Sequence, residues 1–452
     1  MQSIPSISLR QNLPQPQLIH QLHTFAEKRG VQLYLVGGSV RALLLNQSIT
    51  DLDFALADNA IVFAKAFADK IGEAFVRLEE QPPTARIVIR ETRLTLDFAG
   101  FRAETLEADL RLRDLTINAM ALDLSSLLAK PAVNLIDPCG GFCDLKEQTL
   151  RFASEGVVID DPLRLLRVYR FAAQLGFEIP EPTIDLIRRH RNRLPQVSSE
   201  RIRDELIKIL TVQNAAPYLR HMAETRLLSE IIPEIEELGQ NTLDHSLFGL
   251  EMFETEPTPD PLLSYQPQIE AYLCEELIYD LCRRQILKLA ILLHKGGTEM
   301  AVRIMNRLRL GRKAAQLMRC LVQNHLSLMA LIDTDDQIER RTTIRFLRDT
   351  GDDWLGVLLL FYANLRSSQE NIHKTDEMMK QIADLYHYEI GPIIERGKLI
   401  TGDDILRTFG MMPGPKIGRI LRHVEDLQFE GQIRTPEEAL EAARTFLESC
   451  GT

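Results

Sequence analysis

Two aspartates separated by a single residue, Asp51 and Asp53, are the side chains of this sequence best placed to do chemistry. Around them, the apolar residues Leu52 and Phe54 alternate with the polar ones, and this period of two predicts a strand. Side chains two positions apart on a strand point to the same face of the sheet. The pair can therefore hold one or two divalent cations, which bind proteins through carboxylate oxygens.

Two glycines, Gly37 and Gly38, end an apolar run a short way before the aspartates. The run predicts a strand over residues 32–36, the glycines predict a turn, and Ser39 is expected to cap the helix that follows. A glycine turn lets backbone amides approach phosphate oxygens, and Arg41 adds a positive charge beside it. A phosphate-binding turn next to a metal-binding pair indicates nucleotidyl transfer.

Three more polar residues lie in apolar surroundings further along the chain. Asp97 falls on a predicted strand over residues 94–98, where it is either a third carboxylate near the cations or an exposed strand residue. Arg113 and Asn118 are five positions apart, so they cannot share one helical face, and part of this stretch must turn. Arg113 can pair with phosphate oxygens. These residues extend the predicted site and leave the role of Asp97 open.

A helical pattern begins at Asp160 and carries three charged residues at intervals of three, Asp161, Arg164 and Arg167. Pro162 is expected in the first turn of this helix, where a missing N–H is tolerated. The spacing places the three charged side chains on one side of the predicted helix. From the residues alone they form either a solvated salt bridge or a binding site, and both interpretations remain open.

Length, net charge and apolar runs limit the number of domains, the kind of partner and the location that we expect for this protein. The length of 452 residues predicts two to four domains, since a single hydrophobic core rarely grows to this size. The formal net charge of −11 argues against a general basic coat for nucleic acid, although it permits a local basic groove. No apolar run reaches the ~18 residues that cross a bilayer, and the first residues lack a signal-peptide pattern. We therefore expect a cytoplasmic protein with reduced cysteines and no membrane contact.

Residues 34–54, YLVGGSVRALLLNQSITDLDF, resemble the first motif of the class II tRNA nucleotidyltransferase and bacterial poly(A) polymerase family. On this motif and those that follow it in the family's order, the sequence is identified as a member of the family. The further motifs are LRLRDLTINAMA at 110–121, DPCGGFCDL at 137–145, DDPLRLLRVYRF at 160–171, SSERIRDEL at 198–206 and TGDDILRTFGMMPGPKIGRIL at 401–421.

The resemblance implies an α+β fold, with an N-terminal nucleotidyltransferase head of polymerase β-like mixed α/β structure followed by an elongated all-α body. The expected parts are a catalytic head at 1–150, a neck with the base-selecting helix at 151–215, a helical body at 216–395 and a tRNA-binding helical tail at 396–452. The implied partners are tRNA, contacted at its acceptor arm and elbow, and CTP or ATP. The arginines expected to contact the acceptor arm are Arg188, Arg189, Arg191, Arg201 and Arg203.

Members of the family extend RNA 3′ ends without a nucleic-acid template, so protein groups select the base. Asp161 would accept a hydrogen bond from an exocyclic amino group, and Arg164 would donate one to the adjacent ring nitrogen. Cytosine and adenine offer this pair of groups, whereas uracil and guanine leave the protein groups unpaired. The expected cofactor is Mg²⁺, held by Asp51 and Asp53. Asp97, placed by its strand position, is expected as the third catalytic residue. The implied nucleotide-binding residues are Gly37, Gly38, Arg41, Arg113, Asn118, Asp161, Arg164, Arg167 and Arg170.

A short connection after residue 100 bears on which nucleotides are added. Only Ala103 and Glu104 separate Arg102 from the next motif, where members that add the full CCA carry a longer flexible loop. Members that add only CC lack that loop, so we expect CC addition with release of pyrophosphate and a separate enzyme for the terminal A. The alternatives are full CCA addition, A addition, poly(A) synthesis, or an RNA-binding module that has lost catalysis.

Three positions depart from the family's pattern: Ala42 replaces an aspartate, Asn46 a glycine and Leu112 an arginine. The residues expected to carry catalysis and base selection are all present, so we expect an active enzyme.

The helical region after residue 240 resembles a degraded HD phosphohydrolase domain. It keeps the histidines His245, His294 and His325, but Lys295 stands where such domains have a metal-binding aspartate. A lysine cannot ligate a cation, so a structural role or a part in tRNA binding is expected there.

Overall fold

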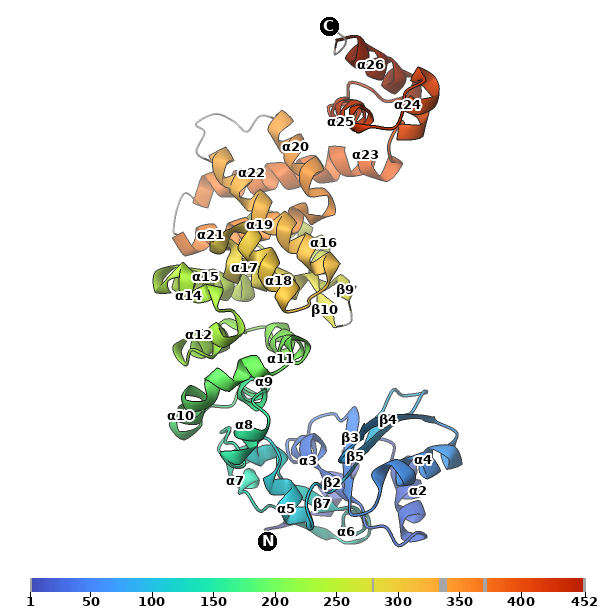
Figure 1. Cartoon of the computed structure of the whole chain (residues 1–452), viewed down its shortest axis with the longest axis vertical. Helices are drawn as coiled ribbons and strands as arrows, with labels where there is room; N and C mark the ends of the chain where they lie inside the picture. Colours follow the sequence, from blue (N-terminus) through green and yellow to red (C-terminus); the bar gives the residue numbers. More distant parts are fainter. Residues whose placement is uncertain (1, 279, 333–339, 369–371, 450–452) are drawn as a thin grey trace. The chain divides into compact units, whose positions relative to one another are not determined.

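The computed structural model describes residues 2–278, 280–332, 340–368 and 372–449. The chain forms two compact units, one of Met1–Ile209 with His221–Ile231 and one of Leu210–Arg220 with Ile232–Thr452. Figure 1 traces it from the sheet near the N-terminus, in blue, to the last helices, in red. A mixed α/β head followed by a helical body is therefore confirmed. Over the described residues, no helix combines the length and the apolar character needed to cross a membrane.

The first unit is built on one eight-stranded sheet, with the strands in the order β1-β8-β7-β2-β3-β6-β5-β4. Strands β3 and β6 run parallel, and the other neighbours are antiparallel. The strands are β1 Gln2–Pro5, β2 Tyr34–Val36, β3 Asp51–Leu56, β4 Ala74–Glu80, β5 Pro83–Val88, β6 Thr95–Gly100, β7 Ala121–Asp123 and β8 Ala132–Ile136.

Some helices of the first unit alternate with the strands and lie beside the sheet, and the others follow the last strand in the chain (Figure 1). Helices α11 and α12 each cross from one unit to the other. The helices are α1 Ser6–Gln11, α2 Pro16–Glu27, α3 Gly37–Leu44, α4 Ala60–Ile71, α5 Leu106–Arg111, η1 Thr116–Asn118, α6 Leu124–Ala129, α7 Gly141–Lys146, α8 Gly156–Asp160, α9 Arg164–Leu175, α10 Glu181–His190, η2 Arg191–Gln196, α11 Ser199–Thr211, α12 Ala216–Glu224 and α13 Leu227–Ile231.

The two faces of the sheet differ in what they carry. On β6, Leu96 and Phe98 are buried and alternate with partly exposed Asp97, as a period of two requires. The ring of Phe63 from α4 packs 5.5 Å from that of Phe98, and Phe25 of α2 packs 5.4 Å from Phe63. Helices α4 and α2 thus cover one face, and the aspartates lie on the other.

Ser39 was predicted to cap the helix after the glycine turn, and that prediction is wrong. Helix α3 begins at Gly37, directly after β2, and no side chain caps it. The hydroxyl of Ser39 instead accepts the N–H of Asp53 at 2.7 Å and donates to the carbonyl of Asp51 at 3.1 Å. A buried contact with β3 outweighs the local capping preference, and it ties the glycine segment to the aspartate strand.

The helix predicted from Asp160 begins later than expected, so the predicted placement of Asp161 on it is wrong. Helix α9 starts at Arg164, and Asp161 has extended backbone angles of φ −138° and ψ 96°. Its carboxylate accepts the N–H of Leu163 at 3.3 Å, across Pro162, which has no N–H to offer. Asp161 and Arg164 are therefore three positions apart in a turn rather than on one helical face.

The second unit is almost entirely helical, with one two-stranded hairpin, β9 Glu276–Ile278 and β10 Leu281–Cys282, that was not predicted. Its last three helices enclose a small apolar core of their own around Ile405, Ile420 and Val424. The helices are α14 Glu234–Leu238, α15 Gln240–Thr255, η3 Asp260–Tyr265, α16 Gln266–Cys274, α17 Arg283–Leu293, η4 His294–Gly296, α18 Gly297–Arg307, α19 Arg312–Ile332, α20 Arg340–Thr350, η5 Gly351–Asp353, α21 Trp354–Ser368, α22 Ile372–Leu385, η6 Tyr386–Ile390, α23 Gly391–Arg396, α24 Gly402–Phe409, α25 Pro415–Phe429 and α26 Pro436–Ser449.

Candidate active site

Three aspartates gather on the open face of the sheet, where β3 and β6 run side by side. Asp53 pairs in register with Asp97, and Asp51 pairs with Thr95. The hydroxyl of Thr95 donates to the carboxylate of Asp51. Burial raises the pKa of Asp53 to about 6, with a further contribution from the Asp97 carboxylate that outweighs the opposing effect of Arg113. Asp53 is therefore a desolvated carboxylate whose charged form is less favourable here than in water.

Arg86, on β5, lies directly across from Asp97 in the antiparallel register. Its Nε and Nη2 each donate to one oxygen of the Asp97 carboxylate, both at 2.7 Å. The hydrogen bond to Asp97 is the main reason that the pKa of Arg86 is raised. This fork-to-fork contact fixes the orientation of Asp97 at the edge of the site.

The two glycines allow a close approach between α3 and the catalytic strand. Gly37 has φ +65°, and a Cβ on it would lie 3.0 Å from Nη1 of Arg113 and 3.4 Å from Oδ2 of Asp53. A Cβ on Gly38 would lie 3.5 Å from the same Asp53 oxygen. Glycine at 37 satisfies both the left-handed backbone and the lack of space. The start of α3 is thereby held beside the carboxylates, as a phosphate-binding turn requires.

A chain of polar contacts runs from α3 through η1 to α9. Arg41 donates to Oδ1 of Asn118, and Nδ2 of Asn118 donates to Asp114 at 3.0 Å. Nε and Nη2 of Arg167 donate to the other oxygen of Asp114 at 2.9 and 2.6 Å. Burial raises the pKa of Asp114, but Arg167 and the hydrogen bonds outweigh it and hold that pKa well below its usual range.

Helix α9 adds an aromatic floor under the arginines. The guanidinium groups of Arg41 and Arg170 lie 4.9 and 4.1 Å from the ring centre of Phe171. Glu205 of α11 is ion-paired with Arg170 at 2.7 Å and with Arg167 at 3.7 Å. Burial lowers the pKa of Arg41 to about 10, and the opposing effect of the Asp114 carboxylate is smaller than that of burial. The ring and the carboxylate hold closely packed cations that would otherwise repel one another.

Asp109, on α5, holds two more arginines at the wall of the site. It is almost fully buried, and it accepts the backbone N–H of Arg102 at 3.1 Å and Nη2 of Arg113 at 3.3 Å. The guanidinium of Arg102 also lies 3.8 Å from this carboxylate. The short segment between β6 and α5 is thereby fixed to the helix that follows it.

These residues enclose a cavity of about 540 Å³. It brings together eleven of the twelve residues predicted from the sequence, and Asp161 does not line it. The carboxylate of Asp161 pairs instead with Nη2 of Arg201 at 2.8 Å, while Arg164 donates to the carbonyl of Val157 at 3.1 Å. The lining residues are Gly37, Gly38, Arg41, Asp51, Asp53, Arg86, Asp97, Arg102, Arg113, Asp114, Asn118, Arg164, Arg167, Arg170 and Phe171.

Four lining residues were not among those predicted. Asp114 and Phe171 lie within recognised motifs, and Arg102 borders the short connection before residue 105, so their positions could have suggested them. Arg86 has no such signal, because only the pairing of β5 with β6 brings it to Asp97. Long-range strand register is not visible in a single sequence.

The donor set fits a small divalent cation. Mg²⁺ is usually held by one or two carboxylates, with substrate phosphate and water completing its coordination. Asp51 and Asp53 provide such a pair, and a cation would offset the cost of burying the charged Asp53 carboxylate. Within the part of the chain that the structure describes, no cluster of three or more His, Cys, Asp or Glu side chains is arranged to hold a metal alone. A pair of carboxylates leaves coordination positions of the ion open to the phosphate oxygens of a substrate.

The histidines of the second unit form a separate, closed cluster. The side-chain amide of Asn364 lies 3.0 Å from Nε2 of both His245 and His294. Nδ1 of His294 donates to the carbonyl of Ile291 at 2.8 Å, and Nδ1 of His325 donates to that of Val322 at 2.7 Å. Burial lowers the pKa of His294 to about 4, so its ring is neutral. The cluster is a hydrogen-bonded part of the core.

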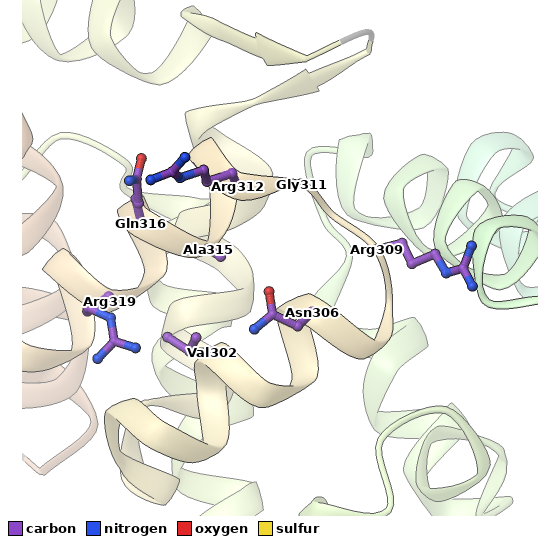
Figure 2. A pocket seen from close by; sticks show the side chains of 8 residues that line it. All are labelled: Val302, Asn306, Arg309, Gly311, Arg312, Ala315, Gln316 and Arg319. Carbon is purple, nitrogen blue, oxygen red and sulfur yellow. The ribbon is translucent and has the colours of Figure 1, made fainter.

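The second unit also has a groove of about 440 Å³ between α18 and α19. In Figure 2 the side chains of Asn306, Gln316 and Arg319 border it, and that of Arg309 points away from it. It contains none of the residues predicted to act in catalysis or nucleotide binding. The predicted site residues are gathered in the first unit.

Family models match three parts of the chain. The model described as "Poly A polymerase head domain" matches residues 33–151, "Probable RNA and SrmB- binding site of polymerase A" matches 176–238, and "tRNA nucleotidyltransferase domain 2 putative" matches 287–443. The first match contains β3, β6 and the three aspartates.

Two curated relatives are similar over nearly their whole lengths. A CC-adding tRNA nucleotidyltransferase of Geobacter sulfurreducens is 32% identical over 436 residues, with 94% of each chain covered. An A-adding tRNA nucleotidyltransferase of Deinococcus radiodurans is 30% identical, with 90% of this chain and 93% of the relative covered.

A solved structure shares the fold. The Thermotoga maritima CCA-adding enzyme complexed with tRNA superposes with a TM-score of 0.71 at 24% identity, covering 99% of this chain and 100% of that one. The fold, the motifs and the full-length similarity agree with one another. The chain therefore belongs to the family of tRNA nucleotidyltransferases and bacterial poly(A) polymerases.

Proposed function

We propose that this protein is a tRNA nucleotidyltransferase that adds the two cytidines of the 3′-terminal CCA, using CTP, without a nucleic-acid template and with release of pyrophosphate. The proposal is carried by one observation: carboxylates and guanidinium groups line the same cavity. A row of aspartates lies at one side, and a set of arginines held by Asp114, Glu205 and Phe171 lies at the other. An enzyme that joins a 3′-hydroxyl to a triphosphate needs both.

The reaction can be written in terms of these residues. The oxygen of the RNA 3′-hydroxyl forms a bond to the α-phosphorus of CTP and gives up its proton to solvent. The bond between the α-phosphorus and the bridging oxygen breaks, and pyrophosphate leaves with that electron pair. Arg41 and Arg113, together with the amides at the start of α3, hold the triphosphate and offset the charge that develops on the leaving group.

Asp51 and Asp53 would hold Mg²⁺, which supplies positive charge at the reacting phosphate and favours ionisation of the attacking hydroxyl. Asp97 is proposed as the third carboxylate of the site, oriented by Arg86. The remaining predicted residues, Gly37, Gly38, Asn118, Arg164, Arg167 and Arg170, are proposed to form the nucleotide site.

Base selection is assigned to Asp161 and Arg164. A carboxylate that accepts from an exocyclic amine and a guanidinium that donates to the neighbouring ring nitrogen admit cytosine or adenine. Arg164 lines the cavity, and Asp161 stands three positions before it with one oxygen paired to Arg201. Asp161 must exchange Arg201 for the base when the nucleotide binds.

Two observations favour CC addition over the alternatives. Strand β6 ends at Gly100 and α5 begins at Leu106, which leaves five residues where longer family members have a flexible loop. The CC-adding relative is similar over the full length of the chain. The A-adding relative has nearly the same similarity, so A addition is the second candidate.

The rest of the chain is proposed to bind tRNA in the cytoplasm. We assign catalysis to 1–150, base selection to 151–215, a structural helical body to 216–395, and contact with the tRNA elbow to 396–452. Solved relatives include the CCA-adding enzyme bound to tRNA, to CTP and to ATP, which supports these partners. A separate enzyme would add the terminal A.

One assay tests the function. The protein is incubated with Mg²⁺ and a tRNA that ends at the discriminator base, a tRNA that ends in CC, or an unrelated RNA, with CTP, ATP or both. We expect two cytidines on the first tRNA with CTP alone and no addition to the CC-ending tRNA with ATP. Adenosine on the CC-ending tRNA would instead establish A or CCA addition, and long A tails on any RNA would establish poly(A) synthesis.

Two variants control this assay. Asp53→Ala should lose all products. Asp69→Ala removes an exposed carboxylate of α4 on the covered side of the sheet and should behave as the wild type. If Asp53→Ala kept its activity, the assignment of the metal-binding pair would be wrong.

A further inference from the structure

Helix α11 meets α9 and the turn before it with two residues of opposite charge. Arg201 and Glu205 are four positions apart on α11, so their side chains share one face of the helix. Arg201 pairs with Asp161 at 2.8 Å, and Glu205 pairs with Arg170 at 2.7 Å. Each charge on α11 therefore faces the opposite charge on the other segment.

The two contacts differ in how easily they can be broken. The side chain of Glu205 is 5% exposed, so loss of its arginine would leave a buried charge without this partner. The side chains of Arg201 and Asp161 are 54% and 27% exposed. An ion pair open to solvent contributes little to stability, and its members can exchange partners at little cost. The Glu205 contact therefore holds α11 in place, whereas the Arg201 contact can change.

Asp161 lies close to the cavity, and its carboxylate is occupied. Burial lowers the pKa of Arg164, and the carboxylates of Asp114 and Asp161 oppose that effect. One oxygen of Asp161 accepts Nη2 of Arg201, and the other accepts the N–H of Leu163 at 3.3 Å. In the part of the chain that the structure describes, the guanidinium of Arg201 has no other ion pair. If Asp161 took another partner, Arg201 would be left exposed and unpaired.

Each member of this pair suits a group of a different substrate. A carboxylate accepts from the amino group of a base, and a guanidinium donates to a phosphate. We propose that Arg201 couples the two substrates: it covers Asp161 in the free protein, and a base that binds Asp161 through an amino group releases Arg201 to a phosphate of the RNA. This inference rests on the proposed function, to which it adds a link between nucleotide binding and RNA binding.

The link has a reciprocal consequence. CTP strengthens RNA binding by the same factor by which RNA strengthens CTP binding, since the two affinities are thermodynamically linked. The factor is about threefold, because an exposed ion pair is a weak interaction. UTP carries the same triphosphate but has a carbonyl in place of the amino group, so it leaves Arg201 on Asp161.

Filter binding tests the coupling without catalysis. The RNA is a tRNA that ends at the discriminator base and lacks the 3′-hydroxyl, so CTP binds and no bond forms. With Mg²⁺, saturating CTP should lower the Kd of the wild type for this tRNA by about threefold, and UTP should not. Arg201→Ala should bind like the wild type without nucleotide and lose the effect of CTP. Lys65→Ala, which breaks an exposed pair on α4, should keep it.

A second variant releases Arg201 permanently. Asp161→Ala should bind the same tRNA about threefold more tightly without nucleotide, and the double variant Asp161→Ala, Arg201→Ala should lose this gain. A gain that persists in the double variant would reflect general charge and overturn the proposal. So would Arg201→Ala if it kept the effect of CTP or weakened binding equally with and without CTP.

Addition of cytidine to an ordinary tRNA, measured on the same preparations, separates this inference from the proposed function. If the wild type adds cytidine and Arg201→Ala keeps the effect of CTP on tRNA binding, only the coupling is wrong. If the wild type adds no nucleotide, the proposed function is wrong, whatever the binding data show.

Discussion

The aspartate–arginine cavity of the first unit and the histidine cluster of the second both gather titratable side chains, but they balance their charges in opposite ways. In the cavity, burial and Asp97 raise the pKa of Asp53 to about 6, and Nε of both Arg41 and Arg113 is buried with no acceptor among the described residues. In the cluster, burial lowers the pKa of His294 to about 4, Nδ1 donates to the carbonyl of Ile291, and Nε2 faces the side-chain amide of Asn364.

The difference separates a site built for a ligand from one built for the fold. A buried charge or donor without a partner costs stability, so it persists only where something else can complete it. A triphosphate would accept hydrogen bonds from the arginines, and its cation would offset the charge of Asp53. The histidine cluster has no such charge to offset, since His294 is neutral, and backbone carbonyls accept from Nδ1 of both His294 and His325.

The largest expected effect is on catalysis. Asp53→Asn keeps the shape of the side chain and removes the charge, so addition to tRNA should fall by about a thousandfold or more, as loss of a metal-binding carboxylate predicts. The folded protein should be as stable as the wild type or more so, because a desolvated carboxylate has been removed. Rates and melting temperatures measured on the same preparations check this. Loss of both activity and stability would show that Asp53 supports the fold.

The reverse pattern is expected in the second unit. His294→Ala opens a cavity and leaves Asn364 and the carbonyl of Ile291 without this partner, which should cost about 2–4 kcal/mol of stability. Nucleotide addition per folded molecule should stay within about twofold below the melting temperature. Denaturant unfolding and the addition assay measure the two quantities. A large loss of activity in a folded variant would contradict a purely structural cluster.

The sequence was sufficient for the features that depend on local spacing. A period of two placed Asp51 and Asp53 on one face, and the family motifs pointed to eleven of the residues that line the cavity. Lys295, in place of a metal-binding aspartate, led to the prediction of a structural role or a part in tRNA binding, and the buried contacts of the histidines favour the structural role.

The features that were missed depend on contacts between distant segments. Arg86 reaches Asp97 only through the register of β5 and β6, which no local pattern encodes. Ser39 was given the role that its local sequence favours, whereas a hydrogen bond to Asp53 decided its position. Asp161 was placed on a helix whose start is set by a turn around Pro162 and Leu163.

Opposite pH dependences should separate the two regions next. The raised pKa of Asp53 means that the folded state holds its proton more tightly than the unfolded state, so this residue's contribution to stability falls as pH rises from about 4 to about 6. The lowered pKa of His294 means that its contribution rises as pH increases from about 4 to about 6.5. Each contribution should be about 3 kcal/mol.

Stability curves in chelator, recorded from pH 4 to pH 7, isolate these contributions. Relative to Asp53→Asn, the wild type should lose stability as pH rises, and relative to His294→Gln it should gain stability. If both stability differences changed with pH in the same direction, the pKa of Asp53 would not be raised while that of His294 is lowered.

A smaller effect is expected from the cation alone. Millimolar Mg²⁺ should raise the melting temperature of the wild type by about 2–4 °C, because it binds the folded pair Asp51 and Asp53 and not the unfolded chain. Asp53→Asn should lose this shift, and His294→Ala should keep it, measured from its own lower baseline. An equal shift in all three proteins would indicate that the cation binds elsewhere.

The smallest effect is expected from an exposed ion pair. Its charges are paired, as the polar groups of the histidine cluster are, but they are open to solvent and can exchange partners. Arg189 on α10 is 58% exposed and pairs with Glu155 at 2.8 Å, so it must leave that carboxylate to reach an RNA phosphate. Arg189→Ala should weaken tRNA binding by only about two- to threefold and reduce the salt dependence by about one phosphate contact. Lys65→Ala breaks a similarly exposed pair with Asp69, at 2.6 Å on α4, and should change neither. Equal effects of both variants in filter binding at several salt concentrations would mean that general charge, rather than a defined RNA contact, governs binding.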